Sequence, residues 1–210
     1  MHETFHAENF YGLCDKLSGQ DAELLQIIRQ HGYPPLWSRK PGFETLIHII
    51  LEQQVSLASA KASLNKLKEK IGSITPKKLL ALTDAELRSC YFSRQKTGYA
   101  RHLAQAILSK QIDLSKLNSL HSDIIRKELK TIKGIGDWTV DIYLLMALHR
   151  TDIFPVGDLA MVNSLKKVKQ LPIHTSREEI LQLAEKWRPY RSLATMLFWH
   201  IYIIERNIRV

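Results

Sequence analysis

The chain has 210 residues, and its 30 lysines and arginines outnumber its 21 aspartates and glutamates, giving a net charge of +9. This length can bury a substantial core in one domain or in two lobes, and the basic balance suits a phosphate-rich partner. Only Cys14 and Cys90 occur, without paired spacing, so nothing supports a disulfide framework, a CxxC zinc site or a four-cysteine iron–sulfur cluster. Charge alone leaves nucleic acid, a membrane surface and mere solubility open.

The ends and the apolar runs of the sequence narrow these choices. Residues Met1–Phe5 lack the basic and apolar regions of a signal peptide. The longest apolar runs, such as Tyr143–Leu148, are too short to span a bilayer. We therefore expect an intracellular chain with reduced cysteines and no membrane partner, in the cytoplasm at the nucleoid of a bacterium or in the nucleus of a eukaryote.

Helix signals recur along the chain, whereas strand-like alternation is rare. Apolar periodicity predicts helices that begin near residues 22, 43, 57, 76, 84, 94, 123, 138, 159, 176 and 193. The expected N-caps are Asp21, Thr75, Thr83, Ser93, Ser122, Asp158 and Thr175. Residues 1–20 carry little pattern, and neither a repeat nor a low-complexity linker occurs. The sequence thus predicts an all-α fold of short helices.

Two closely spaced glycines, Gly134 and Gly136, separate two of these helices within the stretch Leu129–Asp141. Glycine tolerates positive φ and lets backbone amides approach a ligand closely. Asp137 can cap the helix that follows, and a helix N-terminus favours an anion such as phosphate. Ordinary tight turns and helix C-caps use the same residues, so the glycines alone leave both interpretations open.

A second motif, downstream of the two glycines, distinguishes between these interpretations. Leu129–Val140, LKTIKGIGDWTV, resembles the helix–hairpin–helix of the DNA glycosylase superfamily, and Phe154–Asp158, FPVGD, resembles its glycine- and proline-rich loop and aspartate. The likeness is closest to the 3-methyladenine DNA glycosylase II family and covers about residues 43–204. It implies an all-α, two-lobed helix–hairpin–helix glycosylase fold in a single domain, 1–210. One lobe would span about 43–129, and the other would combine 1–42 with 130–210, including the hairpin and the aspartate.

The resemblance also implies how the hairpin is used. Its backbone amides hold a DNA phosphate, and its carbonyl oxygens often hold a monovalent cation, Na+ or K+. The expected DNA-binding residues of the hairpin are Lys133, Gly134, Ile135, Gly136 and Thr139. The expected cation ligands are the carbonyl oxygens of Lys130, Ile132 and Ile135. Many relatives carry proline where this chain has Lys133, which either contacts phosphate directly or is simply solvated.

Asp158 is the expected catalytic residue. An aspartate between glycine and an apolar helix start is a good N-cap, and most such aspartates do nothing more. Cleavage of an N-glycosidic bond, however, develops positive charge on the sugar, which a fixed carboxylate stabilises while it orients water. A single carboxylate suffices where the departing base is cationic, and the resemblance favours this chemical role.

Two aromatic residues are expected to line the base pocket. Trp138 stands where bifunctional relatives place a Schiff-base lysine, so we expect a monofunctional hydrolase. Its ring would form a wall for the extrahelical base, although a core tryptophan at a helix start remains an alternative. Tyr190 lies in Trp187–Ser192, WRPYRS, which resembles a family segment, and could stack on an electron-poor base. Arg191 supports either Asp158 or the fold.

The polar stretch Gln53–Ser56 interrupts an apolar helix. In the family, the matching segment fills the gap that the flipped nucleotide leaves, which would make Gln54 the plug and Gln53 a further DNA-binding residue. Some members carry leucine at the plug position, whereas an amide can hydrogen-bond the orphaned base. A plain polar turn is the alternative.

Together these features predict a monofunctional DNA glycosylase. It would act as a monomer on double-stranded DNA, flip out a damaged purine, alkylated ones such as 3-methyladenine first, and hydrolyse the bond to leave an abasic site. No cofactor is expected for catalysis. Two alternatives stay open: a non-catalytic helix–hairpin–helix protein that binds DNA structure, and a glycosylase with lyase activity.

Overall fold

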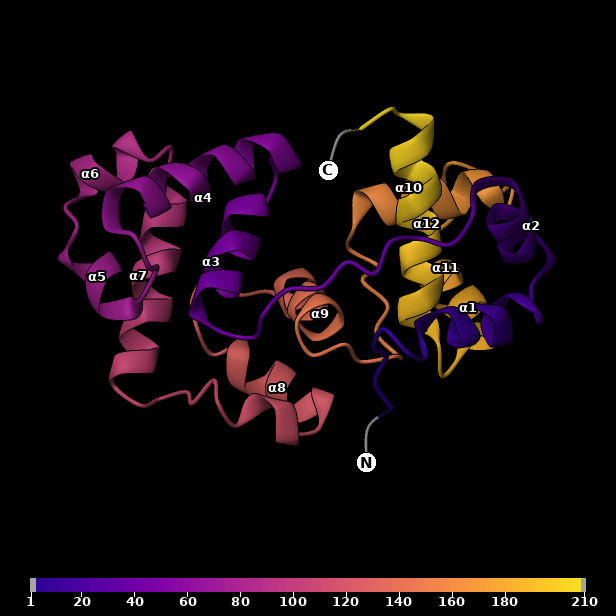
Figure 1. Ribbon diagram of the computed structural model, residues 1–210, viewed down its shortest axis with the longest axis horizontal. Coiled ribbons are helices and arrows are strands. Elements are labelled where there is room, and N and C mark those ends of the chain that lie inside the picture. Colours follow the sequence, from indigo (N-terminus) through magenta and orange to yellow (C-terminus); the bar gives the residue numbers. More distant parts are fainter. Residues whose placement is uncertain (1–2, 209–210) are drawn as a thin grey trace. The chain divides into compact units, whose positions relative to one another are not determined.

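The computed structural model describes residues 3–208. This part of the chain is all-α, and its only β feature is an isolated bridge between Thr4 and Arg150. The helices, shown in Figure 1, are α1 Phe10–Ser18, α2 Ala22–His31, α3 Phe43–Glu52, α4 Leu57–Ile71, α5 Pro76–Ala81, α6 Asp84–Ser89, α7 Arg94–Leu108, α8 Ser122–Leu129, α9 Asp137–Met146, α10 Leu159–Val168, α11 Arg177–Ala184 and α12 Arg191–Glu205, with short 3-10 helices at Leu117–Ser119 and Glu185–Trp187. The predicted fold class is confirmed.

Local capping explains most of the helix starts. The expected caps that accept a backbone N–H from the first turn are Asp21, Thr75, Thr83, Ser93 and Asp158. Two caps differ by one residue, since His121 rather than Ser122 caps α8 and Ser176 rather than Thr175 caps α11, and α9 and α12 begin one and two residues before the expected starts at 138 and 193. Helix α1 was not predicted. None of the helices in residues 3–208 is long and apolar enough to cross a bilayer.

The chain forms two compact units, and the first contains residues 3–38 and 144–208 of the described part. Its centre is α12, which packs against α1, α2 and α10. The ring of Trp187 is almost fully buried and lies 5.3 Å from the ring of Phe198 and 6.0 Å from that of Phe154. This aromatic cluster fixes the segment that leads into α12.

A buried ionic cluster adds to the first unit. The carboxylate of Asp21 accepts hydrogen bonds from Lys169, from Nζ of Lys186 at 2.9 Å and from the indole N–H of Trp187 at 2.8 Å. Burial alone would raise the pKa of Asp21, but these hydrogen bonds outweigh it and hold the pKa well below its usual range. The cluster ties α2 to the end of α10 and to the segment before α12.

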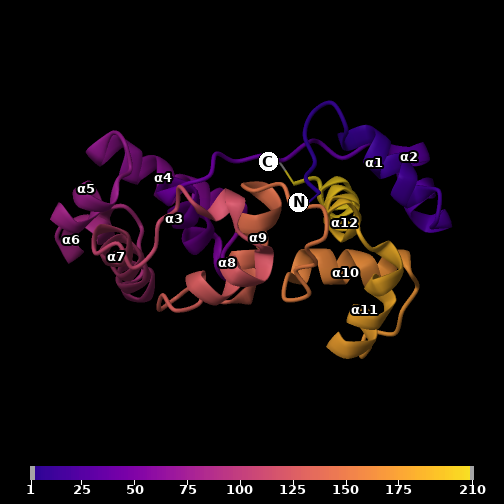
Figure 2. The same cartoon turned by 90° about the horizontal axis from the view of Figure 1, so that it is seen from below.

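The second unit contains residues 39–143. Helix α3 packs against α4 and α7, and α7 also covers α5 and α6. Figure 2 shows α8 and α9 side by side, joined by the hairpin of residues 130–136. Most of the surface of α3 is buried, including the side chains of Leu46, Ile47, Ile49 and Ile50. This unit therefore presents the hairpin on a rigid helical base.

The boundary between the units differs from the expected lobes. The expected division placed residues 130–210 with 1–42, whereas the contacts group the hairpin with residues 39–129. The physical reason lies in the hairpin's own partners, because Gln53 bonds to the carbonyl of Gly134 and Arg126 pairs with Asp137. The division falls inside α9, after Tyr143, so no helix end marks it in the sequence.

Candidate functional site

The hairpin owes its shape to one of its two glycines. Gly134 has φ of +96°, and a Cβ there would lie 2.1 Å from Cγ of Tyr99 on α7. Both the backbone and the neighbouring ring therefore exclude any side chain at this position. At Gly136, by contrast, a Cβ would meet no protein atom within 4 Å. The fold requires glycine at 134 and not at 136.

Hydrogen bonds of the Gln53 side chain stabilise the hairpin. The side-chain amide of Gln53 donates to the carbonyl of Gly134 at 2.9 Å and to the hydroxyl of Thr139 at 3.0 Å. Thr139 is only 1% exposed. Both residues are expected to bind DNA, and this stays a prediction; the hydroxyl of Thr139 itself is buried and used within the hairpin. Both amide hydrogens of Gln53 are used within the protein.

Gln54 lies in the turn between α3 and α4, with φ of +57° and an exposed side chain. The turn is fixed on both sides. Ser56 caps α4 by accepting the N–H of Ser59, and the ammonium of Lys96 donates to the carbonyl of Leu51 at 2.6 Å. Burial lowers the pKa of Lys96. Lys96 is thus a capping group for α3 that the sequence did not reveal, and it leaves Gln54 exposed on a rigid turn.

Ion pairs connect the two helices of the hairpin. Asp137 accepts from Lys130 at 2.7 Å and from Arg126 at 3.0 Å, and Arg126 also pairs with the buried Asp141. The hydrogen bond from Lys130 is the main cause of the lowered pKa of Asp137. Lys133 at the hairpin tip is exposed. Among the residues described, no group of three or more His, Cys, Asp or Glu side chains could hold a metal ion.

Asp158 caps α10 in the first unit. Its Oδ1 accepts the backbone N–H of Met161 at 2.8 Å and the indole N–H of Trp199 at 3.1 Å. The next residue, Leu159, is apolar yet 77% exposed. Two donors on one oxygen fix the orientation of the carboxylate, so the N-cap interpretation and a chemical role are compatible rather than exclusive.

Trp199 is the site residue that sequence reasoning missed. It is 41 positions from Asp158 and lies on α12, so no local pattern connects them. The ring of Trp37 meets that of Trp199 edge-on, with centroids 6.3 Å apart and planes at 75°. The edge-to-face pair keeps the Trp199 indole in place.

The loop before Asp158 is held by a charged network. Arg191 grips Asp152 with two nitrogens, at 2.6 and 3.1 Å, and Arg188 donates to the same carboxylate at 2.6 Å. The buried hydroxyl of Ser192 accepts from the N–H of Ile153 at 2.9 Å and donates to the carbonyl of Arg150 at 2.6 Å. Arg191 therefore supports the loop through Asp152.

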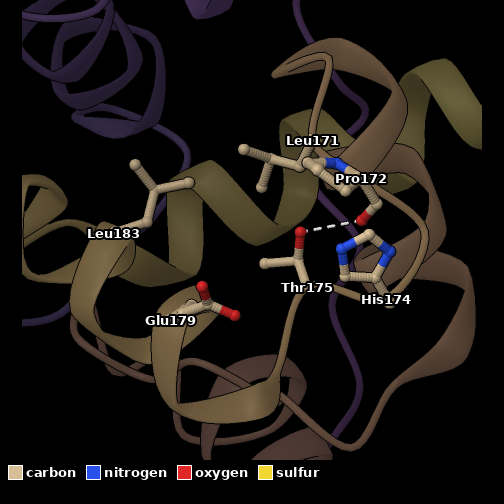
Figure 3. Close-up of a pocket in the computed structure, with 6 residues that line it drawn as sticks. All are labelled: Leu171, Pro172, His174, Thr175, Glu179 and Leu183. Atoms are coloured by element: carbon tan, nitrogen blue, oxygen red, sulfur yellow. Dashed lines mark hydrogen bonds between the residues drawn. The ribbon is translucent and has the colours of Figure 1, made fainter.

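The two expected pocket aromatics belong to different units. Trp138 is half-buried in the first turn of α9, and Tyr190 is half-buried at the start of α12. A hollow of about 310 Å³ elsewhere in the first unit, where α10 connects to α11, contains none of the expected site residues. Figure 3 shows that Thr175, which lines it, donates to the carbonyl of Pro172, at 2.7 Å.

Comparison with known proteins identifies relatives of this arrangement. The family model described as "HhH-GPD superfamily base excision DNA repair protein" matches residues 47–189. The chain is 29% identical to DNA-3-methyladenine glycosylase 1 of Schizosaccharomyces pombe over 87% of its own length and 83% of that protein. It is 27% identical to the putative DNA-3-methyladenine glycosylase YfjP of Bacillus subtilis over 84% of its length, but spans only 64% of that protein. The solved S. pombe 3-methyladenine DNA glycosylase Mag1 in complex with abasic DNA matches with a TM-score of 0.82 and 27% identity, over 90% of this chain and 95% of that one.

Proposed function

Because this chain belongs to the HhH-GPD superfamily of base excision DNA repair proteins, we propose that it is a monofunctional DNA glycosylase for alkylated purines. Its first substrate would be 3-methyladenine in duplex DNA, as the names of the relatives at 29% and 27% identity suggest. The observation that carries the proposal is the carboxylate of Asp158, which the N–H groups of Met161 and Trp199 hold in one orientation. The proposed product is an abasic site.

Asp158 performs the chemistry through its charge. As the bond between the base and C1′ breaks, positive charge develops on the sugar, and a fixed anion stabilises that transition state. The same carboxylate orients the water that attacks C1′. An alkylated purine carries positive charge and departs as a neutral base, so no separate acid is required. Trp138 at the family's lysine position cannot form a Schiff base, which favours hydrolysis over lyase chemistry.

The hairpin would bind the DNA backbone. Its amides, with open space beside Gly136 and the exposed charge of Lys133, suit a phosphate of either strand without sequence preference. A Na+ or K+ ion would be held by the carbonyls of Lys130, Ile132 and Ile135. The Ile132 oxygen already accepts the N–H of Ile135 at 3.1 Å, which leaves its second lone pair for the ion.

Base recognition falls to aromatic rings and to the plug. Trp138 or Tyr190 would stack on the electron-poor base, because a cationic ring is attracted to an aromatic face. Gln54 would fill the space that the flipped nucleotide leaves in the DNA duplex, and its side-chain amide would hydrogen-bond the unpaired base opposite. Flipping costs a few kcal/mol, so weakly paired, damaged bases are favoured.

The enzyme would act as a monomer, at the nucleoid of a bacterium or in the nucleus of a eukaryote.

The direct test is a panel of duplexes that carry 3-methyladenine, 7-methylguanine, 1,N6-ethenoadenine, hypoxanthine or uracil, followed by alkaline cleavage. The proposal predicts release of 3-methyladenine by the wild type and a loss of at least about 100-fold in Asp158→Asn. Asparagine still caps a helix, so this variant keeps its fold.

Two outcomes would favour the alternatives. DNA binding without release of any base would indicate a non-catalytic protein that recognises DNA structure. A covalent DNA adduct trapped by borohydride would indicate a glycosylase with lyase activity and contradict the role given to Trp138.

A further inference from the structure

The proposed phosphate-binding hairpin carries a single acidic residue. Between residues 129 and 139 the sequence has two lysines, Lys130 and Lys133, and one aspartate, Asp137. Asp137 is the first residue of α9 and directly follows Gly136, where a Cβ would meet no protein atom within 4 Å. The first N–H groups of a helix have no acceptor within it, so those around Gly136 are the ones offered to a phosphate. A negative side chain therefore stands beside the place that an anion would occupy.

Asp137 is exposed and holds two cations of α8 and the hairpin. Its side chain is 48% exposed, and its carboxylate accepts hydrogen bonds from Nζ of Lys130 at 2.7 Å and from Arg126 at 3.0 Å. Arg126 also pairs with Asp141, whose side chain is only 9% exposed. Lys130 is the more exposed of the two cations. Asp137 thus neutralises a surface lysine at the edge of the proposed DNA-binding element.

A carboxylate at this position opposes phosphate binding in two ways. Consecutive Cα atoms are about 3.8 Å apart, so the charge of Asp137 lies within a Debye length of a phosphate at Gly136 and repels it. The carboxylate also keeps Lys130 in an ion pair. Lysine and arginine side chains that neutralise phosphates supply most of the affinity of a protein for DNA without sequence preference. Both effects lower the affinity of the hairpin for DNA.

A purely structural role for Asp137 is the alternative. An acidic residue in the first turn interacts favourably with the helix dipole, and its ion pairs join α8 to α9. Exposed ion pairs contribute little to stability, however, and Arg126 has a second partner in Asp141. The two roles predict opposite results when the charge is removed. Loss of structural support would weaken DNA binding, whereas loss of repulsion would strengthen it.

We propose that Asp137 limits the affinity of the hairpin for the DNA backbone and thereby speeds release of the product. The inference rests on the proposed function. An abasic product has the same backbone phosphates as the damaged substrate, so a hairpin that binds phosphate too tightly would retain both. Removal of the carboxylate would free Lys130 to contact a phosphate.

Removal of the charge at nearly constant size is the test. Asp137→Asn should bind a duplex with an abasic-site analogue about 3- to 10-fold more tightly at low salt, mainly through slower dissociation. The slope of log affinity against log salt concentration should steepen by about one, because Lys130 then displaces one more counterion. Fluorescence anisotropy and stopped-flow competition measure these quantities. Asp137→Glu keeps the charge and should bind like the wild type.

A second variant tests the part played by Lys130. Lys130→Met in the Asp137→Asn background removes the lysine that the first substitution frees. The salt slope of this double variant should return to the wild-type value, and part of the gain in affinity should be lost. A double variant that keeps the full gain and the steeper slope would overturn the role given to Lys130.

Glu44→Gln is the matched control in the same unit. Glu44 pairs with Lys68 at 2.6 Å and its side chain is 45% exposed, so this variant loses the same charge and a similar ion pair. Glu44 lies in the first turn of α3 and Lys68 in the last turn of α4, about 12 Å or more along each helix from the Gln54 turn. Its DNA affinity and salt slope should stay at the wild-type values.

Three results would overturn the proposal. They are unchanged binding by Asp137→Asn, weaker binding by Asp137→Asn, and an equal gain in Glu44→Gln, which would make net charge alone responsible. These measurements follow binding and not base release. A wild type that binds the duplex but releases no base therefore contradicts only the proposed function.

Discussion

The hairpin and the Asp158 segment are held in different ways, each within its own unit. Shape and a neutral hydrogen bond fix the hairpin turn, since Tyr99 excludes a side chain at Gly134 and Gln53 donates to the carbonyl of Gly134, while ion pairs of Asp137 join the flanking helices. Charges fix the loop that leads to Asp158, through Asp152 with Arg191 and Arg188. In the proposed function, the phosphate-binding hairpin needs a fixed backbone, whereas the catalytic carboxylate needs a preorganised orientation.

The largest effect that would test this comparison is at Gly134. Gly134→Ala places a Cβ against the ring of Tyr99 and strains a backbone at φ of +96°, so we expect a loss of about 3–5 kcal/mol in unfolding free energy. Chemical denaturation measures it. Gly136→Ala is the control and should unfold like the wild type. Adding Tyr99→Ala should restore part of the loss, and no recovery would contradict the packing argument.

The second effect tests how much buried ion pairs stabilise the first unit. Asp21→Asn leaves Lys169 and Lys186 without their buried partner, at a cost of about 3 kcal/mol at neutral pH. Because the folded pKa of Asp21 is lowered, its stabilisation is present above the unfolded pKa of about 3.9 and is lost as pH falls further. Urea unfolding from pH 7 to pH 2 should show the two proteins converging below about pH 4. A difference that stays constant over this range would contradict the assignment.

A third, smaller effect concerns the support of the hairpin. Gln53→Glu keeps the shape but replaces two donors with an acceptor that faces the carbonyl of Gly134 and the hydroxyl of Thr139. We expect a loss of about 2 kcal/mol in unfolding free energy and weaker DNA binding. Gln54→Glu, one residue along and exposed, is the control and should keep its stability. Equal stability of both variants would show that the hairpin does not depend on Gln53.

The smallest expected effect is at Trp199. Trp199→Phe removes the indole donor to Asp158 and keeps an aromatic ring, while the N–H of Met161 still binds the carboxylate. Base release should slow by about 5- to 10-fold. Tyr202→Phe on the same helix should behave as wild type in a single-turnover assay. A Trp199→Phe rate equal to wild type would remove Trp199 from the site.

These residues also show where sequence reasoning succeeds and where it stops. The caps Asp21, Ser93 and Asp158 were predictable because each signal lies within one helical turn. The all-α class followed from the helix signals, and the two-lobed fold followed from the resemblance of the hairpin and aspartate motifs to a known family. The partners of Gln53 are 81 and 86 positions away, so its support of the hairpin could not be predicted from the polar stretch around it. For the same reason the role of Trp199 was invisible, since nothing near it in the chain indicates a carboxylate.

The separation of grip from chemistry is the central claim, and one single-turnover experiment tests it. Base release from a 3-methyladenine duplex is measured at increasing enzyme concentration for Asp158→Asn and for Gly136→Ala. Asp158→Asn should bind within about threefold of wild type but release base at least about 100-fold more slowly. Gly136→Ala should bind about tenfold more weakly yet reach the wild-type rate at saturation, because its Cβ obstructs only the phosphate. A wild-type rate for Asp158→Asn, or a slow saturated rate for Gly136→Ala, would contradict the account.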